Sequence, residues 1–201
     1  MTQFKYYMFN KPFGYITANR DPRKPVIMEF FPQFEEEGLF PVGRLDRETE
    51  GLLFITNDGQ WSHKMMHPDF NKEKRYEFTV LGDLTEEKKK VLEEGVLLTS
   101  MDEKTAPCKI SIKRKCCLED VYESLHSDIQ SKEKSRRRDY PVTIGEIVIT
   151  EGKKRQIRRM MRYMQCTVLR LKRVEIAGIV LDESLEPGAY RPMDIENESV
   201  K

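Results

Sequence analysis

Residues 42–59 read VGRLDRETEGLLFITNDG, and this stretch decides how the chain is interpreted. It places one carboxylate, Asp46, between Arg44 and Arg47, directly ahead of an apolar run at residues 51–56 with the character of a buried strand. Positive neighbours favour an ionised carboxyl group, and apolar residues behind it limit access of water. The stretch predicts a nucleophilic or electrostatic carboxylate or, on the plainer interpretation, a charged turn before a strand.

The composition indicates a globular protein with its own core. The chain has 201 residues, of which 38% are hydrophobic and 34% are charged, and it contains no run of about 20 apolar residues. Its four cysteines form no CxxC pair, which favours reduced thiols over a disulfide framework or a zinc ribbon. We therefore expect a soluble, cytoplasmic protein with no membrane partner.

Metal and cofactor sites find little support in the sequence. His63 and His67 are four residues apart, a spacing that could place both on one helix face, but no HExxH motif or third ligand accompanies them. Neither a P-loop nor a GxGxxG motif occurs. We expect neither a metal nor a cofactor.

The positive charge is concentrated in one segment although the formal net charge is only +1. Residues 153–174, KKRQIRRMMRYMQCTVLRLKRV, contain nine Lys or Arg and no acid. A basic run without compensating acids is typical of a phosphate-binding face, with a solvated cationic helix as the alternative.

Periodicity and turn residues predict an α+β domain with a sheet of mixed or largely antiparallel pairing. Residues 131–138 are expected to be a mobile, charged loop. The expected strands are residues 5–9, 15–17, 51–56, 74–81, 109–113, 141–150, 167–172, 173–177 and 179–181, and the expected helices are residues 58–66, 86–94, 118–129 and 153–164.

Three separated stretches together resemble the RsuA-type family of bacterial rRNA pseudouridine synthases. They are FNKPFGYIT at residues 9–17, GRLDRETEGLLFITNDG at 43–59 continued by MMHPDFNKEKRYEFTV at 65–80, and EGKKRQIRRMM at 151–161. The resemblance covers nearly the whole chain. It implies a single catalytic domain over residues 1–201 with the pseudouridine synthase fold, in which helices flank a mixed, largely antiparallel central sheet and the active-site cleft lies between two lobes.

The resemblance also implies roles for individual residues. Asp46 matches the catalytic aspartate, which acts at C1′ of the target uridine, and Tyr76 matches the active-site tyrosine that stacks on the base. The alternative for Tyr76 is a residue on the core face of its strand. The remaining matches are Arg158 as partner of the aspartate, Ile157 as an apolar floor beneath the base, Arg44 as the arginine that holds the target nucleotide out of its stack, and Lys153, Arg155 and Arg159 as further substrate-binding positions.

The chain departs from many relatives at its N-terminus. The KPFG motif begins near the tenth residue, which leaves no room for the N-terminal S4 module of some relatives. The chain thus resembles the short members, typified by ribosomal large-subunit pseudouridine synthase E, and this implies 23S rRNA as substrate, free or in an assembling subunit. We expect a monomer, with a charged insertion at about residues 101–140.

Two other functions compete with this interpretation. Asp46, Glu48 and Glu50 form a local carboxylate cluster of the kind that a glycosidase uses on a glycosidic bond. The basic segment alone would suit a non-catalytic rRNA-binding or assembly protein.

Overall fold

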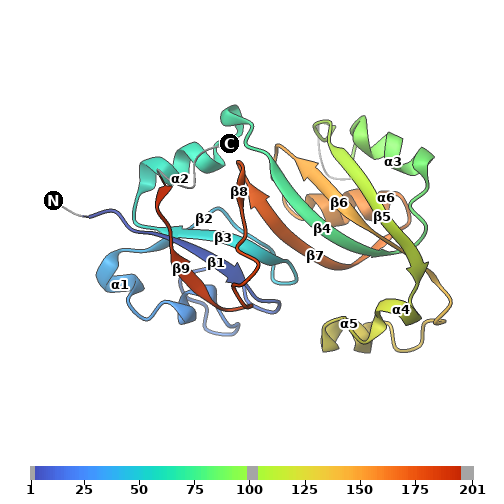
Figure 1. Ribbon diagram of the computed structural model, residues 1–201, viewed down its shortest axis with the longest axis horizontal. Coiled ribbons are helices and arrows are strands. Elements are labelled where there is room, and N and C mark those ends of the chain that lie inside the picture. The colour runs from blue at the N-terminus through green and yellow to red at the C-terminus, as the bar shows by residue number, and fades with distance from the viewer. Residues whose placement is uncertain (1–2, 99–103, 196–201) are drawn as a thin grey trace. The chain divides into compact units, whose positions relative to one another are not determined.

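The computed structural model describes residues 3–98 and 104–195, and the chain divides into two compact units. Unit 1 contains the chain up to Lys74 and from Lys172 onward, and unit 2 runs from Arg75 to Leu171. Both consist of strands with a few short helices (Figure 1). The predicted α+β class with a mixed, mostly antiparallel sheet is confirmed.

Unit 1 is built around β1 (Tyr6–Lys11) and β3 (Glu50–Thr56), which pair antiparallel with Phe9 opposite Leu53. β9 (Tyr190–Pro192) lies on the other side of β1, and β2 (Phe40–Val42) pairs with β3. The end of β7 (Thr167–Ile176) runs parallel to the start of β3 and carries the short β8 (Ile179–Val180).

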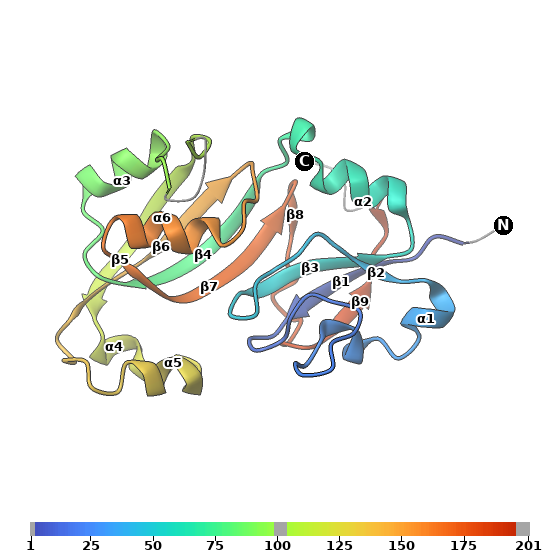
Figure 2. The ribbon, with the colours of Figure 1, turned by 180° about the vertical axis from the view of Figure 1, so that it is seen from behind.

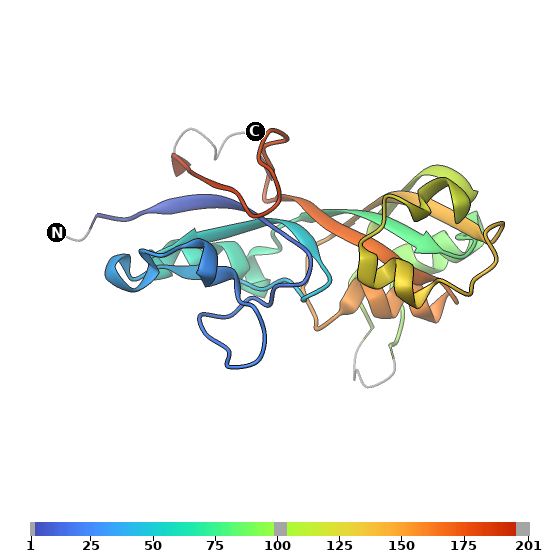
Figure 3. The ribbon, with the colours of Figure 1, turned by 90° about the horizontal axis from the view of Figure 1, so that it is seen from below.

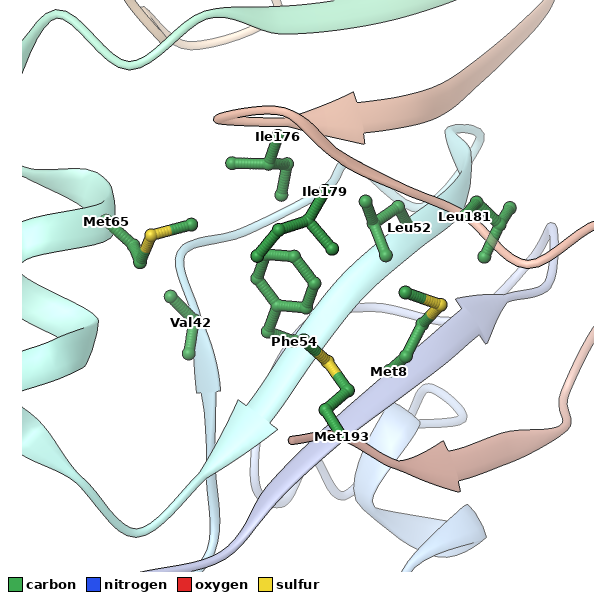
Figure 4. Packing of buried hydrophobic residues seen from close by; sticks show 9 residues of the cluster. All are labelled: Met8, Val42, Leu52, Phe54, Met65, Ile176, Ile179, Leu181 and Met193. Carbon is green, nitrogen blue, oxygen red and sulfur yellow. The ribbon is translucent and has the colours of Figure 1, made fainter. Parts of the chain in front are cut away.

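The core of unit 1 fixes β3 from both faces, because every residue from Gly51 to Thr56 is buried. Figure 4 shows one part of this core, in which side chains from β1, β2, β3, α2 and the C-terminal segment meet. Helix α2 (Gly59–Met66) starts one residue after the predicted limit, because Asp58 is its cap: the Asp58 carboxylate accepts the N–H groups of Gln60 (2.9 Å) and Trp61 (3.0 Å). The short α1 (Phe34–Glu37) and 3-10 turns at Ile27–Phe30 and Pro68–Phe70 complete the connections.

Unit 2 contributes the strands β5 (Lys109–Cys117), β6 (Pro141–Ile149), β4 (Lys74–Leu81) and β7, in that order along the sheet. β5 and β6 pair antiparallel with Ile110 opposite Ile147. Helix α6 (Gln156–Tyr163) lies on one face of these strands (Figures 2 and 3). Helix α3 (Glu86–Glu93) precedes β5, and α4 (Glu119–Tyr122) and α5 (Ser127–Lys132) follow it.

Several predicted elements have different limits in the structure. Residues 15–17 make only a single bridge, Ile16 to Val26, and residues 118–129 form two short helices because His126 caps a new one at Ser127. Part of the expected loop at 131–138 belongs to α5, and residues 167–177 form one strand up to Ile176. Residues 101–103 of the expected insertion lie outside the described residues, and its remainder contains β5, α4 and α5.

Helix α6 starts three residues later than the predicted start at Lys153. Arg155 has φ +52°, which is the left-handed conformation and is incompatible with the interior of a right-handed helix. Separately, no helix within residues 3–98 and 104–195 is both long and apolar enough to cross a membrane.

Candidate active site

The Asp46 loop, residues 43–49, connects β2 to β3 in unit 1. Asp46 is half-buried, Leu45 beside it is buried, and Arg44 and Arg47 are exposed. The backbone carbonyl of Asp46 accepts the N–H of Thr49 at 3.0 Å, which closes a turn around the carboxylate. The loop therefore presents one partly accessible carboxyl group from an ordered backbone.

The stretch 9–17 holds this loop in place. Gly14 and Arg47 exchange two hydrogen bonds, from the Gly14 N–H to the Arg47 carbonyl (2.8 Å) and from Arg47 Nε to the Gly14 carbonyl (3.0 Å). The Thr17 hydroxyl donates to the Leu45 carbonyl (2.9 Å) and accepts the Leu45 N–H (3.1 Å). The first two of the three motifs in the sequence thus form one structural feature around Asp46.

Lys11 is the centre of this feature, and its side chain is fully buried. Its ammonium donates to the carbonyl oxygens of Pro12 (2.9 Å), Thr49 (2.9 Å) and, more weakly, Arg47 (3.4 Å). Burial lowers the pKa of Lys11 to about 7, while the charges of Glu50 and Asp46 act in the opposite direction. Lys11 therefore ties the Asp46 loop to β1 and contributes to the electrostatic environment of the carboxylate.

Arg173 is a second buried cation, and it contacts the start of β3, where the Asp46 loop ends. Its Nε donates to the Leu52 carbonyl at 2.8 Å, and its backbone lies opposite Gly51 in the parallel pairing of β3 with β7. Gly51 has φ +96°, and a Cβ built there would lie 2.2 Å from the Arg173 carbonyl oxygen. Only glycine permits this close approach, which sets where the Asp46 loop joins β3.

Unit 2 carries the predicted tyrosine on β4. Tyr76 is 7% exposed and lies on the same face of the strand as Phe78 and Val80, which are buried. The position agrees with the core alternative for Tyr76. Its role in base stacking stays a prediction.

Helix α6 carries the other predicted residues of unit 2. Ile157 is buried, and so are Met160, Met161 and Met164. Arg158 is half-buried, and its Nη1 donates to the Val168 carbonyl of β7 at 3.3 Å. This hydrogen bond orients the guanidinium group. Arg155 is exposed, and Lys153 and Arg159 are half-buried.

The start of α6 is held by a buried amide. Gln156 is 3% exposed; its Oε1 accepts the Lys153 N–H at 3.0 Å and its Nε2 donates to Glu151 at 2.5 Å. Glu151 also accepts the Ala106 N–H at 2.8 Å and pairs with the Lys153 ammonium at 3.1 Å. The GKKRQIRR sequence thus forms a tight, strongly basic turn at the entry to the helix.

The two units differ in charge. Unit 2 contains 21 Lys and Arg against 16 Asp and Glu, and unit 1 contains 14 against 18. Opposite net charges explain why the whole chain is nearly neutral. The expected concentration of positive charge is therefore a property of unit 2, which suits contact with phosphates.

The predicted residues fall on both units. Asp46 and Arg44 belong to unit 1; Tyr76, Lys153, Arg155, Ile157, Arg158 and Arg159 belong to unit 2. Neither Lys11 nor Arg173 was predicted as a site residue. β1 was expected to end at Phe9 and instead extends to Lys11, and Arg173 reaches the Leu52 carbonyl only through the pairing of β7 with β3. A lysine directly after an apolar strand and before proline was the available signal.

The two histidines considered as metal ligands stack on each other, with ring centroids 4.5 Å apart. Among the residues that the structure describes, no group of three His, Cys, Asp or Glu is arranged to hold a metal ion.

The profile of the family described as "RNA pseudouridylate synthase" matches residues 5–163, which include the Asp46 loop, Tyr76 and α6 up to Tyr163. The chain belongs to this family. A protein of Haemophilus influenzae named "Ribosomal small subunit pseudouridine synthase A" is 35% identical over 189 residues, which cover 94% of this chain and 70% of that protein. A Bacillus subtilis protein named "Uncharacterized RNA pseudouridine synthase YtzG" is 32% identical over 195 residues, which cover 96% of this chain and 72% of that protein.

Solved structures agree with this assignment. One titled "Crystal structure of pseudouridylate synthase" has a TM-score of 0.78 and 33% identity, and the match covers all of this chain and 75% of that one. A chain from an archaeal box H/ACA sRNP Nop10-Cbf5 complex, at 16% identity and TM-score 0.57, shares the fold. The chain is an RNA pseudouridine synthase, and the names of its relatives support the RsuA-type branch that the motifs indicated.

Proposed function

We propose that this enzyme isomerises a specific uridine of ribosomal RNA to pseudouridine with Asp46 as the catalytic carboxylate at C1′. The observation that carries the proposal is the construction of the Asp46 loop. Lys11, Gly14 and Thr17 fix its backbone through hydrogen bonds, so the half-buried carboxyl group is held at a defined position. Pre-positioned charge of this kind is what a reaction through an electron-poor sugar requires.

The reaction needs no atoms beyond those of the uridine. The bond from C1′ to N1 breaks, uracil turns, and a bond from C1′ to C5 forms; C5 then loses its proton and N1 gains one. The Asp46 carboxylate serves either of two routes. In one it adds to C1′ as N1 leaves, and it leaves again when C5 bonds to C1′. In the other it takes the proton from C2′ as N1 leaves, which gives a C1′–C2′ double bond, and it returns that proton to C2′ when C5 bonds to C1′.

Residues of unit 2 supply the other requirements in this proposal. Arg158 is the positively charged partner of the Asp46 carboxylate, with its guanidinium oriented by the Val168 carbonyl. Tyr76 and Ile157 contact the two faces of the free base and retain it. Arg44, exposed on the loop, holds the nucleotide out of its stack, and Lys153, Arg155 and Arg159 bind phosphates.

Arg158 offers a test with a matched control on its own helix, because Arg162 is exposed and carries the same charge. Arg158→Ala should lower kcat by roughly a hundredfold, the usual loss for one preorganised donor. Arg162→Ala should leave kcat within about twofold. Equal rates for the two variants would remove Arg158 from the active site.

The RNA substrate is the finer part of the proposal. The resemblance to large-subunit synthase E implied 23S rRNA, whereas several relatives are named for the small subunit. We propose rRNA as the substrate class and take the names of these relatives as support for a small-subunit target. A target in 23S rRNA is the alternative outcome of the same experiment.

That experiment maps carbodiimide-resistant adducts across rRNA and tRNA from cells with and without the gene. Loss of one 16S position supports the small-subunit target, and loss of one 23S position supports the large-subunit target. An unchanged rRNA map would contradict the proposal. Analysis of the product in vitro completes the test, since released uracil would indicate a glycosidase instead of an isomerase.

A further inference from the structure

The charged segment 118–140 is a folded part of unit 2. Buried Leu118, Val121, Leu125 and Ile129 give it a small apolar core. The Tyr122 hydroxyl donates to the Gln130 carbonyl, and the Gln130 amide donates back to the Tyr122 carbonyl, both at 2.9 Å. Backbone bonds from Leu118 to Tyr140 and from Glu119 to Arg138 close the segment. Side chains on this segment are therefore presented at defined positions.

The last part of this segment, residues 132–140, is strongly basic and lines a surface pocket. Residues 132–139, KEKSRRRD, contain five Lys or Arg and two acids. A hollow of about 420 Å³ is lined by Lys132, Glu133, Ser135, Arg136, Arg137 and Tyr140. Arg136 pairs with Glu133 at 3.1 Å, Arg137 pairs with Asp139, and Arg138 pairs with Glu119 at 3.8 Å, which fixes the three guanidinium groups. Residues 132–139 still carry a formal charge of +3. An anionic ligand is the complement of this surface.

Aromatic rings accompany the arginines. The Arg138 guanidinium carbon lies 3.3 Å from the centroid of the Tyr122 ring, and that of Arg136 lies 5.3 Å from the centroid of Tyr140. Tyr140 is 38% exposed, so part of its ring is open to a ligand. Cations beside exposed aromatic rings are the combination that binds unpaired nucleotides, because phosphates meet the charge and bases stack on the rings.

We propose that residues 132–140 form a second RNA-binding surface, which holds a single-stranded segment of the rRNA substrate. Lys134 and Arg137 contact phosphates, and Tyr140 stacks on a base. The inference rests on the proposed function for its choice of RNA, but the surface lies outside the three motifs that carry the family resemblance. It would add affinity for RNA beyond the Asp46 region.

The test measures RNA binding in an Asp46→Ala background, so that it does not depend on turnover. The probe is an rRNA fragment with unpaired nucleotides on both sides of the target, titrated at several salt concentrations. Lys134→Gln with Arg137→Gln is compared with Lys88→Gln with Lys90→Gln on α3, which removes the same charge elsewhere in unit 2. The slope of the logarithm of the binding constant against the logarithm of salt concentration should become shallower by about 1.4 when two phosphate contacts on single-stranded RNA are lost. The control pair should leave this slope unchanged.

Tyr140→Leu tests the stacking contact separately. It should weaken binding roughly fivefold or more, the usual loss for one stacked base, without changing the salt slope. Slopes and affinities equal to those of the control pair would overturn the second surface while leaving the Asp46 proposal intact. Conversely, absence of isomerisation by the wild-type protein would refute the proposed function without affecting this binding result.

Discussion

Lys11→Met is the change that tests the buried lysine beneath the Asp46 loop. Methionine keeps the length and apolar stem of the side chain and removes the titratable ammonium. The pKa of Lys11 falls from the ordinary 10.5 to about 7 in the folded protein, chiefly because the group is buried. The unfolded chain retains the ordinary value, so the folded and unfolded states bind different numbers of protons over a defined range of pH.

The sign of the effect follows from this difference. Between pH 7 and 10.5 the unfolded state holds the proton that the folded state has lost, so the free energy of unfolding rises with pH. The slope reaches about 1.4 kcal/mol per pH unit. Below pH 7 Lys11 is protonated in both states, so its contribution to the free energy of unfolding is constant and at its lowest. From pH 7.5 to 9.5 wild type should gain about 2–3 kcal/mol relative to Lys11→Met.

Urea unfolding of both proteins at pH 7.5, 8.5 and 9.5 measures this gain. Tyrosine, cysteine and the other lysines titrate in both proteins and cancel in the difference of their free energies. A difference that stays constant across the range would show that Lys11 remains protonated in the folded protein. It would then refute the reasoning that burial outweighs the nearby carboxylates.

Further predictions concern the backbone around the site. In urea unfolding, Gly51→Ala should destabilise the protein by several kcal/mol more than Gly14→Ala. Both glycines have φ above +90°, but only a Cβ at Gly51 meets backbone atoms. Equal losses would mean that the close approach of Gly51 to Arg173 is unimportant. Asp58→Ala should lower the free energy of unfolding, measured by thermal unfolding, by about 1–2 kcal/mol. It removes the cap of α2 and the acceptor of the Tyr6 hydroxyl. An unchanged Tm would contradict this prediction.

The elements predicted correctly are those with strong local signals. The alternation in KRYEFTVL identifies β4, and Asp58 ahead of GQWSHKMM identifies the start of α2. The entry to α6 was misplaced because it depends on the left-handed Arg155 and on a side-chain bond from Gln156, neither of which periodicity reveals. The division of residues 118–129 into two helices likewise depends on a cap at His126.

The candidate site was predicted unevenly for a related reason. Asp46, Tyr76 and Arg158 were proposed from the family motifs, and their roles stay predictions. Lys11 and Arg173 support Asp46 through hydrogen bonds to carbonyl oxygens, and those partners become neighbours only when β1, β3 and β7 pair. A buried cation of this kind is visible once the strand that contains it is known to extend past Phe9.

The most direct test of the account is single-turnover isomerisation by wild type and Asp46→Asn. Asparagine preserves size and polarity, so the Asp46 loop keeps the bonds made by Lys11, Gly14 and Thr17. The account predicts that the variant still binds the rRNA fragment but forms no detectable pseudouridine, with no uracil released by wild type. Pseudouridine formation by Asp46→Asn at a rate near that of wild type would contradict the central role of this carboxylate.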